Sequence, residues 1–422
     1  MMMLRIRVAA ALAAAAGAMA AAQQPAPPPA WVAVKPIEPP SAPLPPEAAT
    51  ADVTRFSFLA YGDTRTGGGA PNDAEAPNPE HSLVMDGMLA KVRALAPTRF
   101  PVRFVLQSGD GVLRGVEGAR WNNGFTPVIE RLTKGAGIPY FFSVGNHDVT
   151  SGPPGDPQRA IGLHNTLTAI SRLIPPEGSP RRLGGYPTYA FGYGNAFFIA
   201  LDSDIAQDTT QASWVAAQLE RLDRSRYRHV IAFFHHPPYS SGPHSGASAD
   251  PAPGTGVKAA DRVEAQTAAI RTIYMPLFRA HHVRMIVAGH EHMFDHFVER
   301  YDDRGATYRI DTVITGGGGA PTYTYNGEPD LRAYAASAAA SNVRVEHLMK
   351  PGMTIAENPH HFVVIQVDGA ALSLEVIAAG GAPYAPYPGG LSTIPLEDAK
   401  PASAGGAATP SAALRPRSAP GA

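Results

Sequence analysis

Carboxylate, amide and imidazole side chains follow five short apolar runs of this sequence, each at the point where the run ends. The five segments are Gly62-Asp63-Thr64-Arg65, Ser108-Gly109-Asp110, Gly145-Asn146-His147-Asp148, His235-His236-Pro237-Pro238 and Gly289-His290-Glu291-His292. In four of them a glycine precedes the polar residues, and glycine lets the backbone turn sharply and approach a ligand closely. Oxygen and imidazole ligands suit Zn, Mn, Fe or Mg, so the segments indicate chemistry that depends on a metal.

Each segment also has an ordinary structural interpretation. A Gly-Asp pair after a strand is usually a turn, and Asn146-His147-Asp148 could form only a turn and a helix cap. The histidine pairs at 281–282 and 360–361 lack a glycine turn, and we interpret them as structural. Glu291 between two histidines suggests a metalloprotease, but the H-E-x-x-H motif needs a histidine where the sequence has Phe294.

The composition limits the chemistry further. The 422 residues include no cysteine, which excludes disulfides, thiolate metal sites, iron–sulfur clusters and cysteine nucleophiles. Apolar residues make up 44% of the chain and charged residues 17%, which is enough for a sizeable core. The formal charge is -1, so we expect no nucleic acid as a dedicated partner.

Short apolar runs alternate with longer segments, which indicates an α/β fold. Buried strands are predicted at residues 56–61, 103–107, 140–144, 196–201, 229–234 and 283–288. Helical spacing predicts helices at 82–95 and 212–222, and in the second Trp214, Leu219 and Leu222 should face the core. Residues 361–367 and 372–378 flank Asp368-Gly369, which predicts a hairpin that closes a sheet edge. Since ligands bind at the carboxyl ends of strands in such sheets, we expect the polar segments to converge.

The ends of the chain differ from its middle. Residues 1–7 carry two arginines, residues 8–22 are Ala-rich and apolar, and Ala18-Met19-Ala20 matches a signal-peptidase site. We therefore predict a signal peptide at 1–22, export to a periplasm or the exterior, and no transmembrane span after its removal. Residues 23–51 are predicted to be a Pro/Ala-rich linker, 52–379 the folded domain, and 380–422 a disordered tail.

The five segments, in this order, resemble the blocks of the calcineurin-like metallophosphoesterase superfamily. The purple acid phosphatase branch is the most similar, because His235-x-Pro237-x-Tyr239 has its H-x-P-x-Y form and His244 follows at the spacing of its substrate-facing histidine. The glycines at 316–319 are similar to the glycine-rich stretch of the family.

The resemblance implies two facing mixed β-sheets flanked by helices, with the active site at the carboxyl ends of the strands. It implies two divalent metal ions (Mn, Zn, Fe or Mg), bridged by Asp110. Asp63 and His292 would complete the first site, and Asn146, His235 and His290 the second. His147 would lie near the leaving-group oxygen or a phosphoryl oxygen. The reaction implied is hydrolysis of small phosphate mono- or diesters by a metal-bound hydroxide.

Two residues depart from the family pattern. Arg65 stands where the first block has a histidine, and it cannot coordinate a cation, so we expect weaker occupancy of the first site. Leu113 stands where the purple acid phosphatases have a tyrosine, so a coloured iron–tyrosinate site is not supported. Because guanidinium groups recognise phosphate, we hypothesise that Arg65 contacts the phosphate of the substrate.

Two other functional classes remain open from the sequence. One is a metal-binding but inactive relative that acts as a phosphate-ligand binding module, which the missing first-site ligand favours. The other is an envelope structural protein that uses its Pro/Ala-rich ends. The long connections at 150–185 and 240–261 are either tolerated insertions or loops that rim the site and select substrates.

Overall fold

The computed structural model describes residues 32–67, 72–149, 155–244, 263–323, 325, 334–335, 338, 342–349, 357–381, 384–397 and 400–401. The predicted signal peptide at 1–22 lies outside the described residues. So do residues 23–31 of the predicted linker and residues 402–422 of the predicted tail. Among the described residues, no helix is long and apolar enough to cross a membrane.

The first sheet has the strand order β13-β12-β11-β1-β2-β3. Its strands are β1 (Arg55–Tyr61), β2 (Val102–Gln107), β3 (Tyr140–Phe142), β11 (His361–Asp368), β12 (Ala371–Ala378) and β13 (Thr393–Leu396). The strands β1, β2 and β3 are parallel, while β11 runs antiparallel to β1. The carboxyl ends of three neighbouring strands therefore meet at one edge of this sheet.

The second sheet has the order β10-β8-β9-β7-β6-β5-β4, and β14 pairs with β9 off this path. Its strands are β4 (Tyr189–Tyr193), β5 (Ala196–Ala200), β6 (His229–Phe233), β7 (Met285–Ala288), β8 (Phe294–Asp303), β9 (Ala306–Thr315), β10 (Val343–His347) and β14 (Lys400–Pro401). The strands β5, β6, β7 and β9 are parallel neighbours. This sheet also gathers several strand carboxyl ends at one edge.

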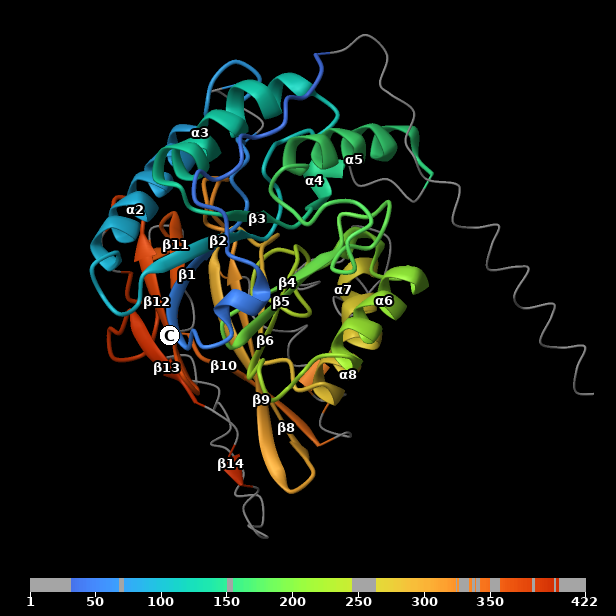
Figure 1. Ribbon diagram of the computed structural model, residues 1–422, viewed down its shortest axis with the longest axis vertical. Coiled ribbons are helices and arrows are strands. Elements are labelled where there is room, and N and C mark those ends of the chain that lie inside the picture. The colour runs from blue at the N-terminus through green and yellow to red at the C-terminus, as the bar shows by residue number, and fades with distance from the viewer. Residues whose placement is uncertain are drawn as a thin grey trace, which may run out of the picture.

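Helices cover the outer faces of the two sheets (Figure 1). They are α2 (Pro79–Leu95), α3 (Thr126–Glu130), α4 (Asn146–Val149), α5 (Pro157–Ile170), α6 (Thr209–Glu220), α7 (Ala265–Ala269) and α8 (Met275–Ala280). Short 3₁₀ or π turns lie at Glu47–Thr50, Arg120–Phe125, Arg131–Gly135, Ser203–Ile205 and Ile270–Tyr274. Asn78 begins α2 by accepting a hydrogen bond from the Glu80 amide, and Pro79 fits the first helical position. The four-layer α/β architecture expected from the resemblance is confirmed.

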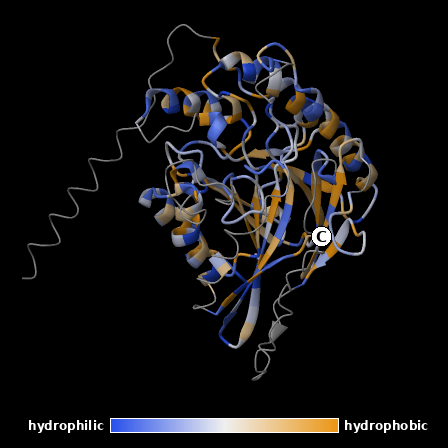
Figure 2. Ribbon diagram, turned by 180° about the vertical axis from the view of Figure 1, so that it is seen from behind, coloured by the Kyte–Doolittle hydropathy of each residue, from blue (hydrophilic) through white to orange (hydrophobic). Residues whose placement is uncertain are grey.

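Aromatic side chains fill the space between the two sheets. The ring of Phe104 on β2 lies 5.0 Å from Phe198 on β5 and 5.5 Å from Phe191 on β4. A second buried cluster packs the outer face of the second sheet against α6, α7 and α8. The strands are accordingly mostly apolar in Figure 2. This double core holds both sheets rigidly beneath the loops that follow their strands.

Most of the predicted elements are confirmed. All six predicted strands form, as β1, β2, β3, β5, β6 and β7, and the predicted helices are α2 and α6. The hairpin at Asp368-Gly369 joins β11 to β12, with Gly369 at a φ of 62°. Leu219 in α6 and Leu222 just beyond it are buried as expected, and Trp214 packs against the same cluster while half-buried. The connection at 150–185 contains the helix α5, which the Gly- and Pro-rich composition concealed.

Parts of both chain ends that composition assigned to linker and tail belong to the folded body. Val34 and Ile37 are buried in the main core, and the Ile37 amide donates to the Ala169 carbonyl. The strand β13 extends the first sheet beyond residue 379. Proline disfavours a central strand, but an extended segment that contains proline can still pack its apolar side chains. For this reason the Pro-rich composition concealed both the buried N-terminal residues and the strand β13.

Candidate metal centre

The five polar segments lie at the carboxyl ends of neighbouring strands. In the first sheet, Asp63, Asp110 and Asn146 follow β1, β2 and β3, and in the second sheet His235 and His290 follow β6 and β7. The two groups meet, because the His290 amide donates to the Asp63 carboxylate at 3.0 Å. The fold thus brings together segments that are up to 227 residues apart.

Three residues of these loops have a left-handed backbone that side chains rarely adopt. The φ angles are 58° at Asp63, 56° at Asp110 and 71° at His290. Such strain gathers at functional sites, where the surrounding structure must enforce it. Here the Asp63 amide donates to the Gly109 carbonyl at 2.9 Å. A Cβ atom at Gly109 would lie 2.7 Å from the Gly145 nitrogen, so only glycine allows this approach.

Asp148 holds the loops after β2 and β3 together. Its buried carboxylate accepts four backbone N–H groups, from Asp110 (2.8 Å), Gly111 (2.9 Å), Val112 (3.3 Å) and Gly145 (2.9 Å). The carboxylate therefore fixes the backbone from Asp110 to Val112 and at Gly145, next to Asn146. Asp148 therefore positions the two loops. A residue that only formed a turn or capped a helix would bond to its own segment, whereas Asp148 also bonds to residues 36–38 positions earlier.

Hydrogen-bond acceptors converge on one nitrogen of His235. Its Nδ1–H donates to the Ser108 carbonyl at 3.0 Å, and burial lowers the pKa of the ring to about 3, so at neutral pH Nε2 carries a lone pair. This Nε2 lies 2.9 Å from Asn146 Oδ1, 3.2 Å from His290 Nδ1 and 3.4 Å from Asp110 Oδ1. The Nε2–H of His290 donates to Glu264 at 2.8 Å, so in the neutral ring Nδ1 is the nitrogen that carries the lone pair.

These acceptor contacts are repulsive unless a cation lies among them. Ligand atoms about 2.0–2.2 Å from a zinc-like ion lie about 3.0–3.5 Å from one another, which is close to the three distances from His235 Nε2. The donor set of two imidazoles, one carboxylate and one amide oxygen also suits borderline divalent metals. The second group of predicted ligands, Asp110, Asn146, His235 and His290, therefore fits a metal ion.

The first group is arranged differently. Asp63, Asp110 and His292 each offer one ligand atom, all within 4.8 Å of one another. Arg65 lies among them, because its Nε donates to Asp110 Oδ2 and its Nη2 donates to His292 Nε2, both at 3.3 Å. His292 uses its other nitrogen, Nδ1–H, to donate to the Pro321 carbonyl at 2.7 Å. The first group therefore does not fit a metal ion as the second does, since Arg65 already satisfies two of its ligand atoms.

The charges of the first group support this description. Burial and the positive charge of Arg65 lower the pKa of His292 to about 2, so its ring is neutral and accepts from the guanidinium. Burial and the neighbouring Asp110 carboxylate raise the pKa of Asp63 well above its usual range. Two neighbouring buried carboxylates are stabilised either by a proton on one of them or by positive charge nearby, which Arg65 supplies.

The remaining predicted site residues border the two groups. The Nδ1–H of His147 donates to the Leu113 carbonyl at 2.8 Å, which leaves Nε2 4.0 Å from Asp110 Oδ2. The ring of His244 lies 4.3 Å from the ring of His290. All nine site residues predicted from the sequence are thus brought together.

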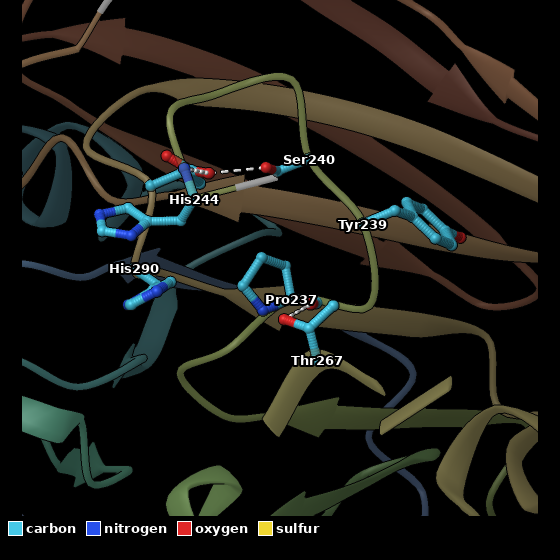
Figure 3. Close-up of a pocket in the computed structure, with 7 residues that line it drawn as sticks. Pro237, Tyr239, Ser240, His244, Thr267 and His290 are labelled. Atoms are coloured by element: carbon cyan, nitrogen blue, oxygen red, sulfur yellow. Dashed lines mark hydrogen bonds between the residues drawn. The ribbon is translucent and has the colours of Figure 1, made fainter. Parts of the chain in front are cut away.

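A pocket beside His290 is formed by the loop after β6 (Figure 3). It is lined by Pro237, Tyr239, Ser240, His244, Thr267, His290 and Glu291. The buried carboxylate of Glu291 accepts from the Ser240 hydroxyl at 2.7 Å and from the His244 amide at 2.8 Å. Glu291 therefore holds His244 at the mouth of the metal centre.

Sequence reasoning missed Glu264, which contacts His290 and lies 3.4 Å from His244 Nδ1. No motif surrounds it in the sequence. His236, Glu264 and His290 also offer ligand atoms within 4.8 Å of one another. We favour the His235 group, because His236 Nδ1 forms a 2.9 Å hydrogen bond with the Ser203 hydroxyl and Glu264 accepts the His290 N–H. Tyr323 was missed as well, and its ring stacks on His292 at 4.1 Å.

The calcineurin-like phosphoesterase family matches residues 84–294, which is half of the chain. The chain belongs to this family. The family match includes every predicted site residue except Asp63 and Arg65, which precede it. The search of curated proteins found no match.

The chain is also similar to several solved structures. A purple acid phosphatase from yellow lupin (Lupinus luteus) seeds is 16% identical with a TM-score of 0.51, over 85% of this chain and 55% of that one. This chain therefore spans about half the length of the lupin enzyme. The anchor in the inner membrane complex of Plasmodium is 13% identical with a TM-score of 0.47, over 83% and 90% of the two chains. A dimetal phosphatase from Danio rerio is 13% identical with a TM-score of 0.42, over 82% and 99%.

Proposed function

We propose that this protein is an exported, metal-dependent phosphoesterase that hydrolyses small phosphate mono- or diesters. The observation that carries the proposal is the convergence of acceptor atoms on His235 Nε2, at 2.9, 3.2 and 3.4 Å from Asn146, His290 and Asp110. Membership of a phosphoesterase family supports the reaction class. Export rests on the Arg- and Ala-rich residues 1–22.

The family pattern has two cation positions that share Asp110, and the two differ in this chain. Asp110, Asn146, His235 and His290 would hold an ion at the second position, while Asp63, Asp110 and His292 line the first. A bound divalent ion supplies positive charge for the phosphoryl oxygens and makes a water molecule more acidic. The protein's own contribution is a rigid and buried set of ligands whose lone pairs already face the ion.

His147 is suited to proton transfer at the leaving group. The hydrogen bond of its Nδ1–H to Leu113 fixes the ring, its side chain is 32% exposed, and its Nε2 lies 4.0 Å from Asp110 Oδ2. A histidine in this position can protonate the leaving oxygen or donate a hydrogen bond to the phosphoryl group. His244, held by Glu291 and paired with Glu264, would contact the substrate from the opposite side.

Hydrolysis of p-nitrophenyl phosphate and bis(p-nitrophenyl) phosphate, with and without added Mn²⁺ or Zn²⁺, tests the proposal. We expect turnover of at least one ester, loss of turnover on chelation, and recovery when the metal is added back. His235→Ala serves as the control for contaminating phosphatases. If neither ester is hydrolysed although the metal binds, the protein is instead an inactive phosphate-binding module.

A further inference from the structure

The guanidinium of Arg65 is embedded in the first ligand group. It contacts the same two atoms that a first ion would need, His292 Nε2 and Asp110 Oδ2, each at 3.3 Å. The side chain of Arg65 is only 12% exposed. An arginine remains protonated in proteins, and each of its N–H groups can only donate. The two ligand atoms are therefore already engaged by a positive group.

Hydrogen bonds on every side hold Arg65 in this position. Its amide donates to the Asp110 carbonyl at 3.2 Å, and its Nη1 donates to the Thr66 carbonyl at 3.3 Å. The Asn78 side chain donates to the Arg65 carbonyl at 3.3 Å and to the Gly319 carbonyl at 2.9 Å. To admit an ion, the guanidinium would have to leave a buried position and give up three hydrogen bonds of its side chain.

The second ligand group shows the opposite arrangement. There His235 Nε2 and His290 Nδ1 face each other at 3.2 Å, and both rings donate their other N–H away from the site. An ion at the second position relieves the repulsion between two acceptors, whereas an ion at the first position must displace a cation. The two positions should therefore differ greatly in affinity, although they share Asp110.

We propose that the guanidinium of Arg65 takes the place of the first metal ion, so that the protein binds one divalent ion per chain, at the second position. The inference rests on the metal centre of the proposed function. The sequence led to the hypothesis that Arg65 contacts the phosphate of the substrate. In the present proposal Arg65 supplies a fixed positive charge beside that phosphate while its guanidinium remains bound to Asp110 and His292.

The metal content of Arg65 variants tests the inference without an activity assay. The full chain is stripped with a chelator, equilibrated with Mn²⁺ or Zn²⁺ and freed of unbound ions, and metal per chain is measured by elemental analysis. We expect one ion per chain in the unmodified protein. We expect two in Arg65→His, which restores an imidazole and removes the guanidinium. Electron paramagnetic resonance of the Mn²⁺ forms should change from an isolated ion to a coupled pair.

Two further variants make the result decisive. Arg65→Met removes the N–H donors at similar size, so it should also gain a second ion, and it replaces the histidine variant if that variant does not fold. Arg99→His adds a histidine at a 67% exposed position and should stay at one ion. Two ions in the unmodified protein, or one in both Arg65 variants, would overturn the inference. No bound ion in the unmodified protein would instead refute the metal centre itself.

Discussion

The Nδ1 atom of His290 lies 3.2 Å from the Nε2 atom of His235, and in the neutral rings these are the nitrogens left without a proton, because the other nitrogen of each ring donates to Glu264 or to the Ser108 carbonyl. Two lone pairs at this distance repel each other, and Asn146 Oδ1 adds a third acceptor 2.9 Å from His235. With both rings neutral, a divalent ion between these atoms would relieve that repulsion.

Removal of the metal should destabilise the protein for this reason. An ion that binds only the folded state adds about 2.7 kcal/mol at a concentration 100-fold above its dissociation constant. Chelation should then lower the melting temperature by roughly 5–11 °C, since about 2–4 °C corresponds to 1 kcal/mol in domains of this order of size. Differential scanning fluorimetry with chelator and with restored Zn²⁺ measures the shift. His235→Ala should show no response to chelator, and a response equal to that of the unmodified protein would contradict the assignment.

The adjacent histidines 235 and 236 should differ in their effect on metal binding. His235→Ala removes the atom on which the ligands converge, so we expect the bound ion to be lost and kcat to fall by ~100-fold or more. His236→Ala removes a ring that is hydrogen-bonded to Ser203, so we expect the ion to be retained at some cost in stability. Elemental analysis of both variants checks this. Equal metal loss in the two would favour the ligand group of His236, Glu264 and His290 instead.

Glu264 should control the affinity of the metal through His290. Its carboxylate accepts the Nε2–H of His290 at 2.8 Å and so keeps the lone pair of Nδ1 directed at His235. Partners of this kind typically change metal affinity by roughly 10–100-fold. We expect Glu264→Ala to lose metal affinity by this factor. Glu264→Gln should lose less affinity, because it keeps an acceptor oxygen. Competition titration with a chromophoric chelator measures both, and unchanged affinity in Glu264→Ala would refute the role.

Glu47 should make stability depend on pH by anchoring the N-terminal segment. Its carboxylate accepts from Arg181 at 3.1 and 3.0 Å, from Tyr227 at 2.8 Å and from the Gly192 amide at 3.0 Å. Burial alone would raise the pKa of Glu47, but the hydrogen bonds of Arg181 and Tyr227 outweigh it and lower the pKa below 4.5. The stabilisation should therefore be complete above about pH 4.5 and be lost as the pH falls through the lower folded pKa.

Glu47→Gln should thus be less stable than the unmodified protein at pH 7 by about 1–3 kcal/mol, with a difference that shrinks in acid. Denaturant unfolding across pH 3–7 measures this difference. Glu38→Gln is the matched control, because Glu38 pairs with Arg172 at the surface, where the two side chains are 47% and 50% exposed. A difference that is constant with pH would contradict the role of the Glu47 charge.

The local sequence predicted the strands that carry the site. Short apolar runs indicated that these strands are buried, and the Gly and Asp residues that follow indicated where several of them end. It did not predict β8, where Asp295 and Glu299 are buried within the strand. Those charges are tolerated since Ser241, His347 and Arg279 reach them from distant segments. A pattern of alternating polarity cannot anticipate such pairing.

The sequence by itself determined the ligand types, their order along the chain and the departure at Arg65. Only the tertiary structure decided which ring nitrogens carry lone pairs, that Glu264 orients His290, and that the guanidinium contacts Asp110 and His292. The sequence gives the residue types of these groups, but the hydrogen bonds between the groups join positions 26, 45 and 227 residues apart. The packing of the two sheets sets those distances, and through them it decides whether each acceptor meets a proton donor or another acceptor.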